Sequence, residues 1–250
     1  MVEERLFGDD LCSPSVQLRI SPMGDVEVLS THDQLLGGPS GQMFLGCTFP
    51  AEESYRQLIT RHARAVGSEL ARRGVVGRFG VDFITRRTAR GGWEAHAIEV
   101  NLRNGGTTHP ALILLAMTDG QYDDDSGKFV AGGKAKHYVA SDHLEHPAYR
   151  ALTPDDALDV LSEPDLAWNP ERLVGAVSHM TSAVAVSGRV GITAVGDSAA
   201  EAQALHESAQ TALEDAAEMP GPNCAARLLG TSAGDGSVAA QNRPGRCCCG

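Results

Sequence analysis

The most constraining feature of this 250-residue sequence is the segment spanning residues 77–110, which reads GRFGVDFITRRTARGGWEAHAIEVNLRNGGTTHP. Within and just before it, residues 75–85 and 93–103 are rich in β-branched and aromatic side chains, which favour strands. The tripeptide RGG at residues 90–92 is typical of a turn. The segment therefore predicts a β-hairpin, whose register decides which side chains share a face.

The register of this hairpin is predicted to oppose two acidic side chains. Side chains alternate between the faces of a strand, so Glu99, Asn101 and Arg103 share one face. If residues 89–92 form the loop, Asp82 lies directly across from Glu99. A slip of one residue would move every side chain to the other face. The apolar residues that alternate with the polar ones are expected to form a buried side: Val81, Phe83, Val100 and Leu102.

This polar face suits a hard divalent cation. Two carboxylates that lie opposite each other in a ladder repel, and a cation between them removes that cost. Mg²⁺ takes oxygen ligands, usually one or two carboxylates with phosphates and waters, and Asp82, Glu99 and the Asn101 carbonyl oxygen match this requirement. The planar guanidinium of Arg103 could stabilise charge on a transferring phosphoryl group. The alternative is a polar hairpin face that meets only solvent.

These residues also carry a resemblance to a known superfamily. The string EVNLR at residues 99–103, preceded by VDF at 81–83, resembles the metal-binding end of ATP-grasp proteins, and its arginine resembles the biotin-carboxylase-type variant. The continuation NGGTTHP at 104–110 resembles peptide ligases of the pheganomycin type, and the similarity extends over residues 1–215. One departure is Gly80, at the position where D-alanine ligase-like members carry an arginine. Shorter matches are SPSVQ (13–17), THDQ (31–34) and FPA (49–51).

The resemblance implies an ATP-dependent carboxylate–amine ligase that works through an acyl phosphate, with a small carboxylic acid and an amine as substrates. It implies that Asp82, Glu99 and Asn101 hold Mg²⁺ or Mn²⁺ bridging the ATP phosphates, and that Arg103 acts catalytically on the intermediate. The N-terminal residues resemble the hinge between the two ATP-grasp lobes. Glu3 and Glu4 are the candidates there to bind the nucleotide.

Family members also hold the phosphates with two lysines and a glycine-rich flap upstream of the metal motif. The lysines of this chain, Lys128, Lys134 and Lys136, all follow the motif. We therefore expect a partial chain that starts at the hinge and is completed by an upstream ATP-grasp lobe. The alternative is a non-catalytic remnant that binds a metal or a partner protein.

The predicted fold is α+β. It comprises the C-terminal lobe of an ATP-grasp fold, an antiparallel sheet with flanking helices, over residues 1–142, and a small α/β domain over 143–218. Residues 219–250 are rich in Pro, Gly, Ala and Ser without periodicity, which predicts disorder. Apolar residues at helical spacing predict a long helix over 51–73. A capping box, Ser-Ala-Ala-Glu, predicts another helix over 198–217.

The remaining segments are shorter. Two loops leave two interpretations each. The glycine-rich residues 37–41 could cradle a phosphate or connect to the substrate side, and residues 104–108 could bind an anion or cap a helix. Further expectations are a hairpin over 16–30, a short helix over 110–117, an exposed loop over 121–133, and strands over 173–186 and 189–196.

Composition narrows the class of partner. The formal net charge of −11 argues against a nucleic-acid or acidic-membrane partner. No apolar run approaches a membrane span, and the N-terminus lacks the basic and apolar regions of a signal peptide. We expect a cytoplasmic protein. The adjacent cysteines at 247–249 lack the spacing of a structural zinc site.

Overall fold

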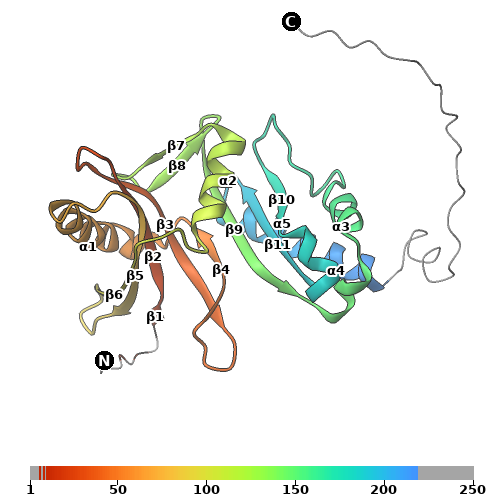
Figure 1. Ribbon diagram of the computed structural model, residues 1–250, viewed down its shortest axis with the longest axis horizontal. Coiled ribbons are helices and arrows are strands. Elements are labelled where there is room, and N and C mark those ends of the chain that lie inside the picture. Colours follow the sequence, from red (N-terminus) through yellow and green to blue (C-terminus); the bar gives the residue numbers. More distant parts are fainter. Residues whose placement is uncertain (1–5, 7, 9, 219–250) are drawn as a thin grey trace, which may run out of the picture.

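The structure is a computed structural model that describes residues 6, 8 and 10–218 (Figure 1). The predicted nucleotide-binding residues Glu3 and Glu4 lie outside the described residues, and so does the predicted disordered segment 219–250. These two predictions therefore stay untested.

One antiparallel sheet runs through the molecule in the strand order β1-β5-β2-β3-β4-β9-β11-β10, and helices flank it, as predicted. Strand β6 pairs with β5, and the β7–β8 hairpin joins β9. The strands are β1 (Leu11–Cys12), β2 (Pro14–Ile20), β3 (Val26–Gly37), β4 (Met43–Phe49), β5 (Gly77–Arg87), β6 (Trp93–Asn101), β7 (Gln121–Asp123), β8 (Lys128–Ala131), β9 (Lys134–Glu145), β10 (Gly175–His179) and β11 (Arg189–Gly196). The helices are α1 (Glu53–Arg72), α2 (Thr108–Thr118), α3 (Pro154–Leu161), α4 (Val184–Ser187) and α5 (Ala199–Glu218), with 3₁₀ turns η1 (Pro147–Ala151) and η2 (Thr181–Ala183).

Helix α1 covers one face of the N-terminal half of the sheet, and the prediction of a long helix there is confirmed. The Glu52 side chain accepts a hydrogen bond from the Ser54 N–H at its start. Gly67 lets the helix approach closely, since a Cβ there would lie 2.7 Å from Val26 Cγ1. The core beneath α1 consists of buried apolar side chains from the helix and strands β2, β3 and β5: Val16, Leu18, Ile20, Val28, Tyr55, Ile59, Ala63, Phe79, Val81 and Phe83.

Helix α2 lies near the middle of the molecule, between the N-terminal strands and the C-terminal unit (Figure 1). It is apolar on all sides, yet only Thr108, Pro110 and Leu114 are buried. Leu114 packs in a second cluster with Phe49 and Tyr138, which stack at 4.8 Å between ring centroids. Helix α2 therefore packs against the sheet through a narrow contact.

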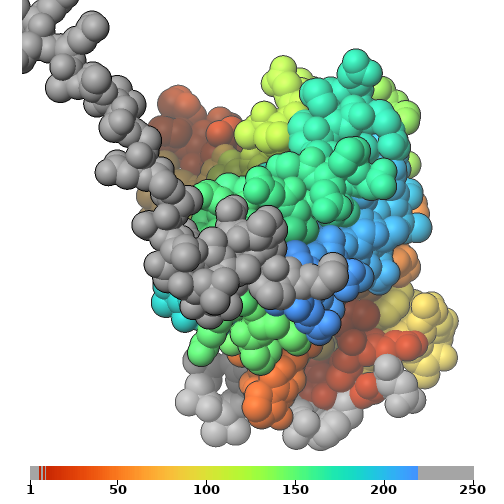
Figure 2. Space-filling model, turned by 90° about the vertical axis from the view of Figure 1, so that its right-hand side faces the viewer, coloured from red at the N-terminus to blue at the C-terminus, as the bar shows by residue number. Residues whose placement is uncertain are grey.

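The C-terminal unit uses the far end of the same sheet. Helix α5 packs on β9 and β11 around Leu144, Ile192 and Leu213. Figure 2, which views the molecule from the right-hand side of Figure 1, shows this unit in green to blue facing the viewer. Strand β9 pairs with both β4 and β11, so the predicted boundary between residues 142 and 143 falls inside a strand that both units share. The division into two domains stays a prediction.

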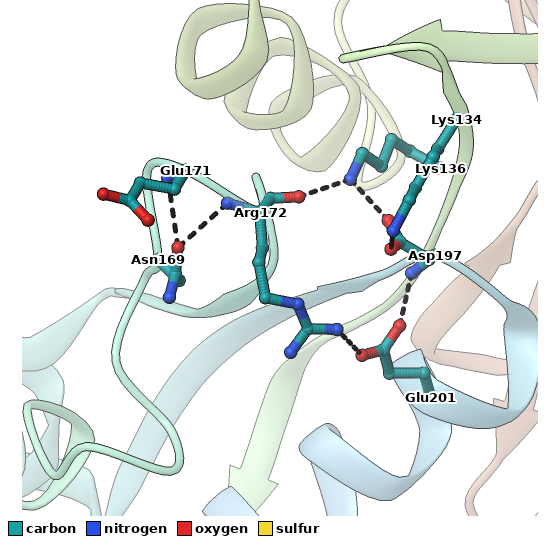
Figure 3. Close-up of polar contacts among 7 residues, drawn as sticks. All are labelled: Lys134, Lys136, Asn169, Glu171, Arg172, Asp197 and Glu201. Atoms are coloured by element: carbon teal, nitrogen blue, oxygen red, sulfur yellow. Dashed lines mark hydrogen bonds and ion pairs between the residues drawn. The ribbon is translucent and has the colours of Figure 1, made fainter.

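A polar network ties this unit together (Figure 3). Asp197 accepts hydrogen bonds from Lys134 Nζ at 2.6 Å and from Lys136 Nζ at 2.5 Å. Lys136, only 1 % exposed, also donates to the Arg172 carbonyl at 2.7 Å. The Arg172 guanidinium bonds Glu201, which accepts from the Asp197 N–H. The network joins β9, the loop before β10 and the start of α5.

Two element predictions are wrong. Residues 121–133 contain the β7–β8 hairpin, in which Phe129 and Ala131 point into the core while Lys128 faces solvent. This alternation is short enough to be lost among the surrounding glycines and acids. Residues 173–186 form only β10, because Met180 adopts a left-handed conformation that ends the strand, and η2 and α4 follow. Among the described residues, no helix combines the length and apolar character that a membrane crossing needs.

Candidate active site

The β5–β6 hairpin brings the predicted carboxylates together. Asp82 lies directly opposite Glu99, as predicted, although the loop spans residues 88–92 rather than 89–92. If the pairing next to the loop, Arg87 with Trp93, continued along the hairpin without a bulge, Ile98 would lie opposite Asp82. A bulge at Ile98 absorbs the extra residue and restores the opposition of the two carboxylates.

The prediction of a buried hairpin side is correct for the residues of β5 and wrong for Val100 and Leu102. Val81 and Phe83 are fully buried under α1, but Val100 and Leu102 are exposed by 41 % and 57 %. Helix α1 contacts the start of β6 through Trp93. The end of the strand carries Val100 beyond that cluster, so its apolar side chains lack a cover within the described part of the chain.

The surroundings of the Asp82 carboxylate disfavour its ionised form. Asn101 Nδ2 donates to its Oδ2 at 2.9 Å, and Gln34 Nε2 donates to its Oδ1 at 3.2 Å. Burial, followed by the negative charge of Glu99, raises the pKa of Asp82 to about 6 against the lowering effects of Arg103 and the two amides. Ionised Asp82 is therefore under-compensated by the protein's own groups.

The three predicted metal ligands, Asp82, Glu99 and Asn101, and the predicted catalytic Arg103 line one cavity of about 360 Å³ on the polar face of the sheet. Among the described residues around it, Arg103 is the only cation, and its Nη1 donates to the Asn104 carbonyl at 3.1 Å. The sequence analysis missed Gln34 and Asp142, which come from β3 and β9. The full lining is Gln17, Gln34, Leu36, Gln42, Phe44, Gly80, Asp82, Glu99, Asn101, Arg103, Gly105, Gly106, Thr107 and Asp142.

The absence of a side chain at Gly80 has a local structural reason. The Gln17 side chain from β2 lies over it, and a Cβ at Gly80 would come within 2.7 Å of Gln17 Nε2. Gln17 Oε1 in turn lies 3.5 Å from the hydroxyl of Thr108, which accepts from the Gly105 N–H at 2.9 Å. The Gln17 amide therefore occupies the space that a side chain at position 80 would enter.

The glycine-rich loop before α2 closes one end of the cavity. Gly106 lies against the Phe44 ring, where a Cβ would come within 2.5 Å of Cε1. Thr107 precedes the helix without capping it through its side chain. The helix start therefore lacks a side-chain cap from Thr107, while the Thr108 N–H donates to the Gly105 carbonyl at 3.0 Å. Anion binding by this loop stays a prediction.

A second, wider cavity of about 540 Å³ adjoins the first and shares Gln34 and Leu36 with it. The glycine-rich loop at residues 37–41 reaches it, since Gly41 is part of its wall. The remaining wall is largely apolar or hydroxyl-bearing: Leu11, Cys12, Ser13, Asp33, Tyr55 and Ile84.

The lysines lie away from these cavities. Lys134 and Lys136 are bound to Asp197 (Figure 3), and neither they nor Lys128 belong to the cavity walls. A separate acidic group, Asp123–Asp125, sits in the β7–β8 turn with its oxygens within 4.8 Å of one another. The Asp123 carboxylate there already accepts hydrogen bonds from the turn, so this cluster has a local structural role.

Comparison with known proteins shows the family of the chain. A family model described as IQCH-like, ATP-grasp matches residues 1–125. L-propargylglycine–L-glutamate ligase of Streptantibioticus cattleyicolor is 32% identical over 201 residues, which are 80% of this chain and 40% of that protein. IQ motif-containing protein H of Danio rerio is 31% identical over 107 residues, which are 42% of this chain and 10% of that protein. The chain thus spans less than half the length of these relatives.

Solved structures support the fold. The phosphoribosylaminoimidazole carboxylase ATPase subunit from Aquifex aeolicus superimposes with a TM-score of 0.50 at 16% identity, covering 85% of this chain and 58% of that one. At this level of identity the likeness concerns the fold alone. Since the family model covers half of the residues, the chain belongs to the IQCH-like ATP-grasp family.

Proposed function

We propose that this chain is the catalytic C-terminal lobe of an ATP- and Mg²⁺-dependent carboxylate–amine ligase. The observation that carries the proposal is the grouping of Asp82, Glu99, Asn101 and Arg103 around one cavity. The relationship to L-propargylglycine–L-glutamate ligase supports the reaction class.

The donor set fits a hard divalent cation. Asp82 and Glu99 supply two opposed carboxylates. The Asn101 amide nitrogen faces Asp82 in the structure, so rotation of the side-chain amide by about 180° would direct its oxygen to a metal there. The pKa of Asp82 is raised first by burial and then by the negative charge of Glu99, and a bound cation would offset both effects. When bound, Mg²⁺ or Mn²⁺ would neutralise negative charge on the ATP phosphates.

The two adjoining cavities suit the two halves of a nucleotide. The phosphates would occupy the cavity that contains Asp82 and Arg103, and the base would occupy the wider one, against Leu11, Leu36 and Ile84. The predicted hinge residues Glu3 and Glu4 would bind the ribose. Such a nucleotide would bring its terminal phosphate to Arg103, whose fork can bind oxygen atoms of the transferred group.

The reaction follows in two steps. A carboxylate oxygen attacks the terminal phosphorus, and ADP leaves. The amine nitrogen then attacks the carbonyl carbon of the acyl phosphate, the C–N bond forms, and inorganic phosphate leaves as the C–O bond breaks. Arg103 would stabilise negative charge in the first step through contacts made only as the phosphoryl group moves.

An upstream lobe would complete the phosphate site. A triphosphate needs more positive charge than Arg103 and the metal provide, and two of the chain's lysines are already bound to Asp197. We infer that further cations and a water-excluding flap come from an upstream ATP-grasp lobe. Such a ligase would work in the cytoplasm with small-molecule substrates, and without nucleic acid or membrane.

The test measures metal binding and ADP release. Isothermal titration with Mg²⁺ and Mn²⁺ should give a site in the wild type that weakens at least tenfold in Asp82→Asn/Glu99→Gln. Glu94→Gln, which removes a carboxylate from the same strand outside the cavity, is the matched control. Equal affinity in the wild type and the double variant would refute the metal site.

ADP release is then measured with ATP, L-glutamate and a pool of amino acids, on this chain and on a version joined to an upstream lobe. We expect release only from the joined version. Metal binding without ADP release from either version would instead favour a metal- or partner-binding remnant.

A further inference from the structure

A pair of histidines lies close to the α2 end of the metal cavity. His109, in the first turn of α2, and His179, the last residue of β10, meet with their Nε2 atoms 3.0 Å apart and their rings inclined at 62°. Both are half-buried. Asp142 on β9 lines the cavity and lies close enough to raise the pKa of both histidines by its charge. The pair joins α2 to β10, and Asp142 brings β9 close to it beside the proposed site.

The neighbouring sequence leaves room for this pair. Gly191 on β11 lies directly across the ladder from His179. A Cβ at that position would overlap the His179 imidazole. The ring therefore lies against bare backbone, and any other residue at 191 would displace it.

Burial favours the neutral form of both histidines. Burial lowers the pKa of His109, and burial together with His109 lowers the pKa of His179 to about 4, while Asp142 acts in the opposite direction on both. A neutral imidazole has one N–H and one lone pair, so one Nε2 donates to the other. Within the described part of the chain, His179 Nδ1 is buried without a hydrogen-bond partner. A contact that served only to join α2 to β10 would gain from satisfying that atom.

Asp142 is poorly placed for a phosphate neighbour. Its carboxylate accepts a hydrogen bond from His143 Nδ1 at 2.8 Å and adds a third acid to a cavity that already contains Asp82 and Glu99. Those two carboxylates are matched to the metal. Apart from His143, the described residues around this third carboxylate offer it no cation within ion-pair distance, so a cationic ligand beside it would be favourable. The second substrate of the proposed ligase, a protonated amine, is such a cation.

We propose that the Asp142 end of the cavity binds the amine substrate as its ammonium ion, and that the His109–His179 pair accepts the proton that this ion must lose. This inference rests on the proposed ligase function and names the acceptor side of the same site. An ammonium nitrogen has no lone pair and cannot attack an acyl phosphate. Transfer of one proton to the pair frees the lone pair, the C–N bond forms, and the second proton leaves with inorganic phosphate.

The binding half of the proposal is tested without ATP. The chain, labelled with ¹⁵N-histidine, is titrated with ethylammonium chloride and, separately, with tetramethylammonium chloride, which has the same charge and no N–H. We expect saturable shifts of the His109 and His179 nitrogens with ethylammonium alone, weakened at least tenfold in Asp142→Asn. Asp119→Asn, an exposed acid at the end of α2, is the matched control. Equal shifts with both salts, or no effect of Asp142→Asn, would overturn the proposal.

The proton-transfer half is tested on the ligase joined to its upstream lobe. Hydroxylamine is largely unprotonated at pH 7, so it traps an acyl phosphate as a hydroxamate without needing a base. With amino acids as carboxylate donors, His179→Gln should lower amide formation with L-glutamate about 100-fold at pH 7 and leave hydroxamate formation unchanged. The defect should shrink toward pH 9, and His96→Gln, an exposed histidine on β6, should behave as wild type.

The outcomes separate the two proposals. Equal loss with both nucleophiles would mean that His179 supports structure only, and no loss with either would mean that the pair is idle; both results overturn the inference. Absence of hydroxamate from every variant, wild type included, would defeat the ligase function itself and with it the proton-transfer step. The ethylammonium titration would still decide whether the amine site exists.

Discussion

Two aspartates in this chain lie in polar clusters of opposite charge: Asp197 lies between two lysines, and Asp82 lies opposite a glutamate. Asp197 accepts from two lysines, and although burial alone would raise its pKa, Lys134 and Lys136 lower that pKa below its ordinary value. Asp82 faces Glu99, and burial followed by the negative charge of Glu99 raises its pKa to about 6. A carboxylate that the protein compensates contributes to the structure, whereas one left short of positive charge is a candidate ligand site. Their proximity to other charged residues alone would not distinguish the two.

The strongest test of this contrast removes the compensated acid. Asp197→Ala leaves Lys136 buried without its counter-charge, and we expect a loss of about 3–5 kcal/mol in the free energy of unfolding at pH 7. Because the folded-state pKa of Asp197 is lowered, its contribution is present above the ordinary carboxylate pKa and is lost as the pH falls through the lower folded value. Urea denaturation at pH 7 and pH 3 measures both effects.

Glu171→Ala is the control for that experiment, because Glu171 lies in the same loop as Arg172, and its side chain carries no contact in the network (Figure 3). We expect a change below about 0.5 kcal/mol there. A loss of similar size in both variants would show that the loop, and not the Lys136–Asp197 pair, carries the stability.

Removing the uncompensated acid should have the opposite sign. The folded-state pKa of Asp82 is raised, so ionisation destabilises the fold as the pH rises from the ordinary carboxylate pKa through about 6. We therefore expect Asp82→Asn to stabilise the metal-free protein by about 1–2 kcal/mol at pH 8 and by almost nothing at pH 4. Urea denaturation at the two pH values is the measurement.

The effect of metal on stability provides a second test of the contrast between the two aspartates. Saturating Mg²⁺ should raise the unfolding midpoint of the wild type and leave that of Asp82→Asn nearly unchanged, since a ligand that binds only the folded state stabilises it. Destabilisation of the metal-free protein by Asp82→Asn at pH 8 would contradict the view that this carboxylate is held at a cost.

Arg103 extends the contrast to cations. It is exposed and bonds a neighbouring backbone carbonyl, whereas Arg172 holds Glu201 inside the network. In the ligase joined to its upstream lobe, Arg103→Lys should lower kcat about tenfold, because lysine cannot reproduce the planar fork. The thermal midpoint should stay within about 1 °C, since exposed substitutions rarely change stability. Unchanged kcat, measured by ADP release, would remove Arg103 from the catalytic role.

The smallest effect is expected at the bulge. Deleting Ile98, which is 46 % exposed, removes the extra residue and leaves Asp82 opposite Glu99 in a continuous ladder. We expect Mg²⁺ affinity, measured by titration calorimetry, to stay within about threefold, because the opposed carboxylates are retained. A loss as large as that of the Asp82 variant would mean that the bulge orients the ligands and does not merely adjust the register.

Local patterns were sufficient where a structure depends on near neighbours in the sequence. Alternation and turn chemistry predicted the β5–β6 hairpin, and helical periodicity predicted α1 to within two residues at each end. The opposition of Asp82 and Glu99 was also predicted, although the assumed loop was one residue too short and the bulge corrected the register. Both residues lie in adjacent strands of one hairpin, which few alternative pairings can disturb.

Patterns failed where the outcome depended on distant packing. Val100 was expected to be buried by its alternation with Val81, but burial requires a covering helix, and α1 reaches only the start of β6. Short strands such as β7 and β8 carry too few residues for a period to show. Met180 ended a predicted strand through a backbone conformation that its residue type does not suggest.

The sequence by itself determined the hairpin, its acidic pair and the resemblance to ATP-grasp ligases, because hydrogen-bonded neighbours in one hairpin follow from local alternation. Only the tertiary structure decided which remote side chains complete the cavity. Gln34 and Asp142 are brought there because β3 and β9 belong to one sheet, and β10 of the same sheet brings His179 to His109 of α2. Such contacts depend on the order and curvature of strands far apart in the chain, and no local period encodes them.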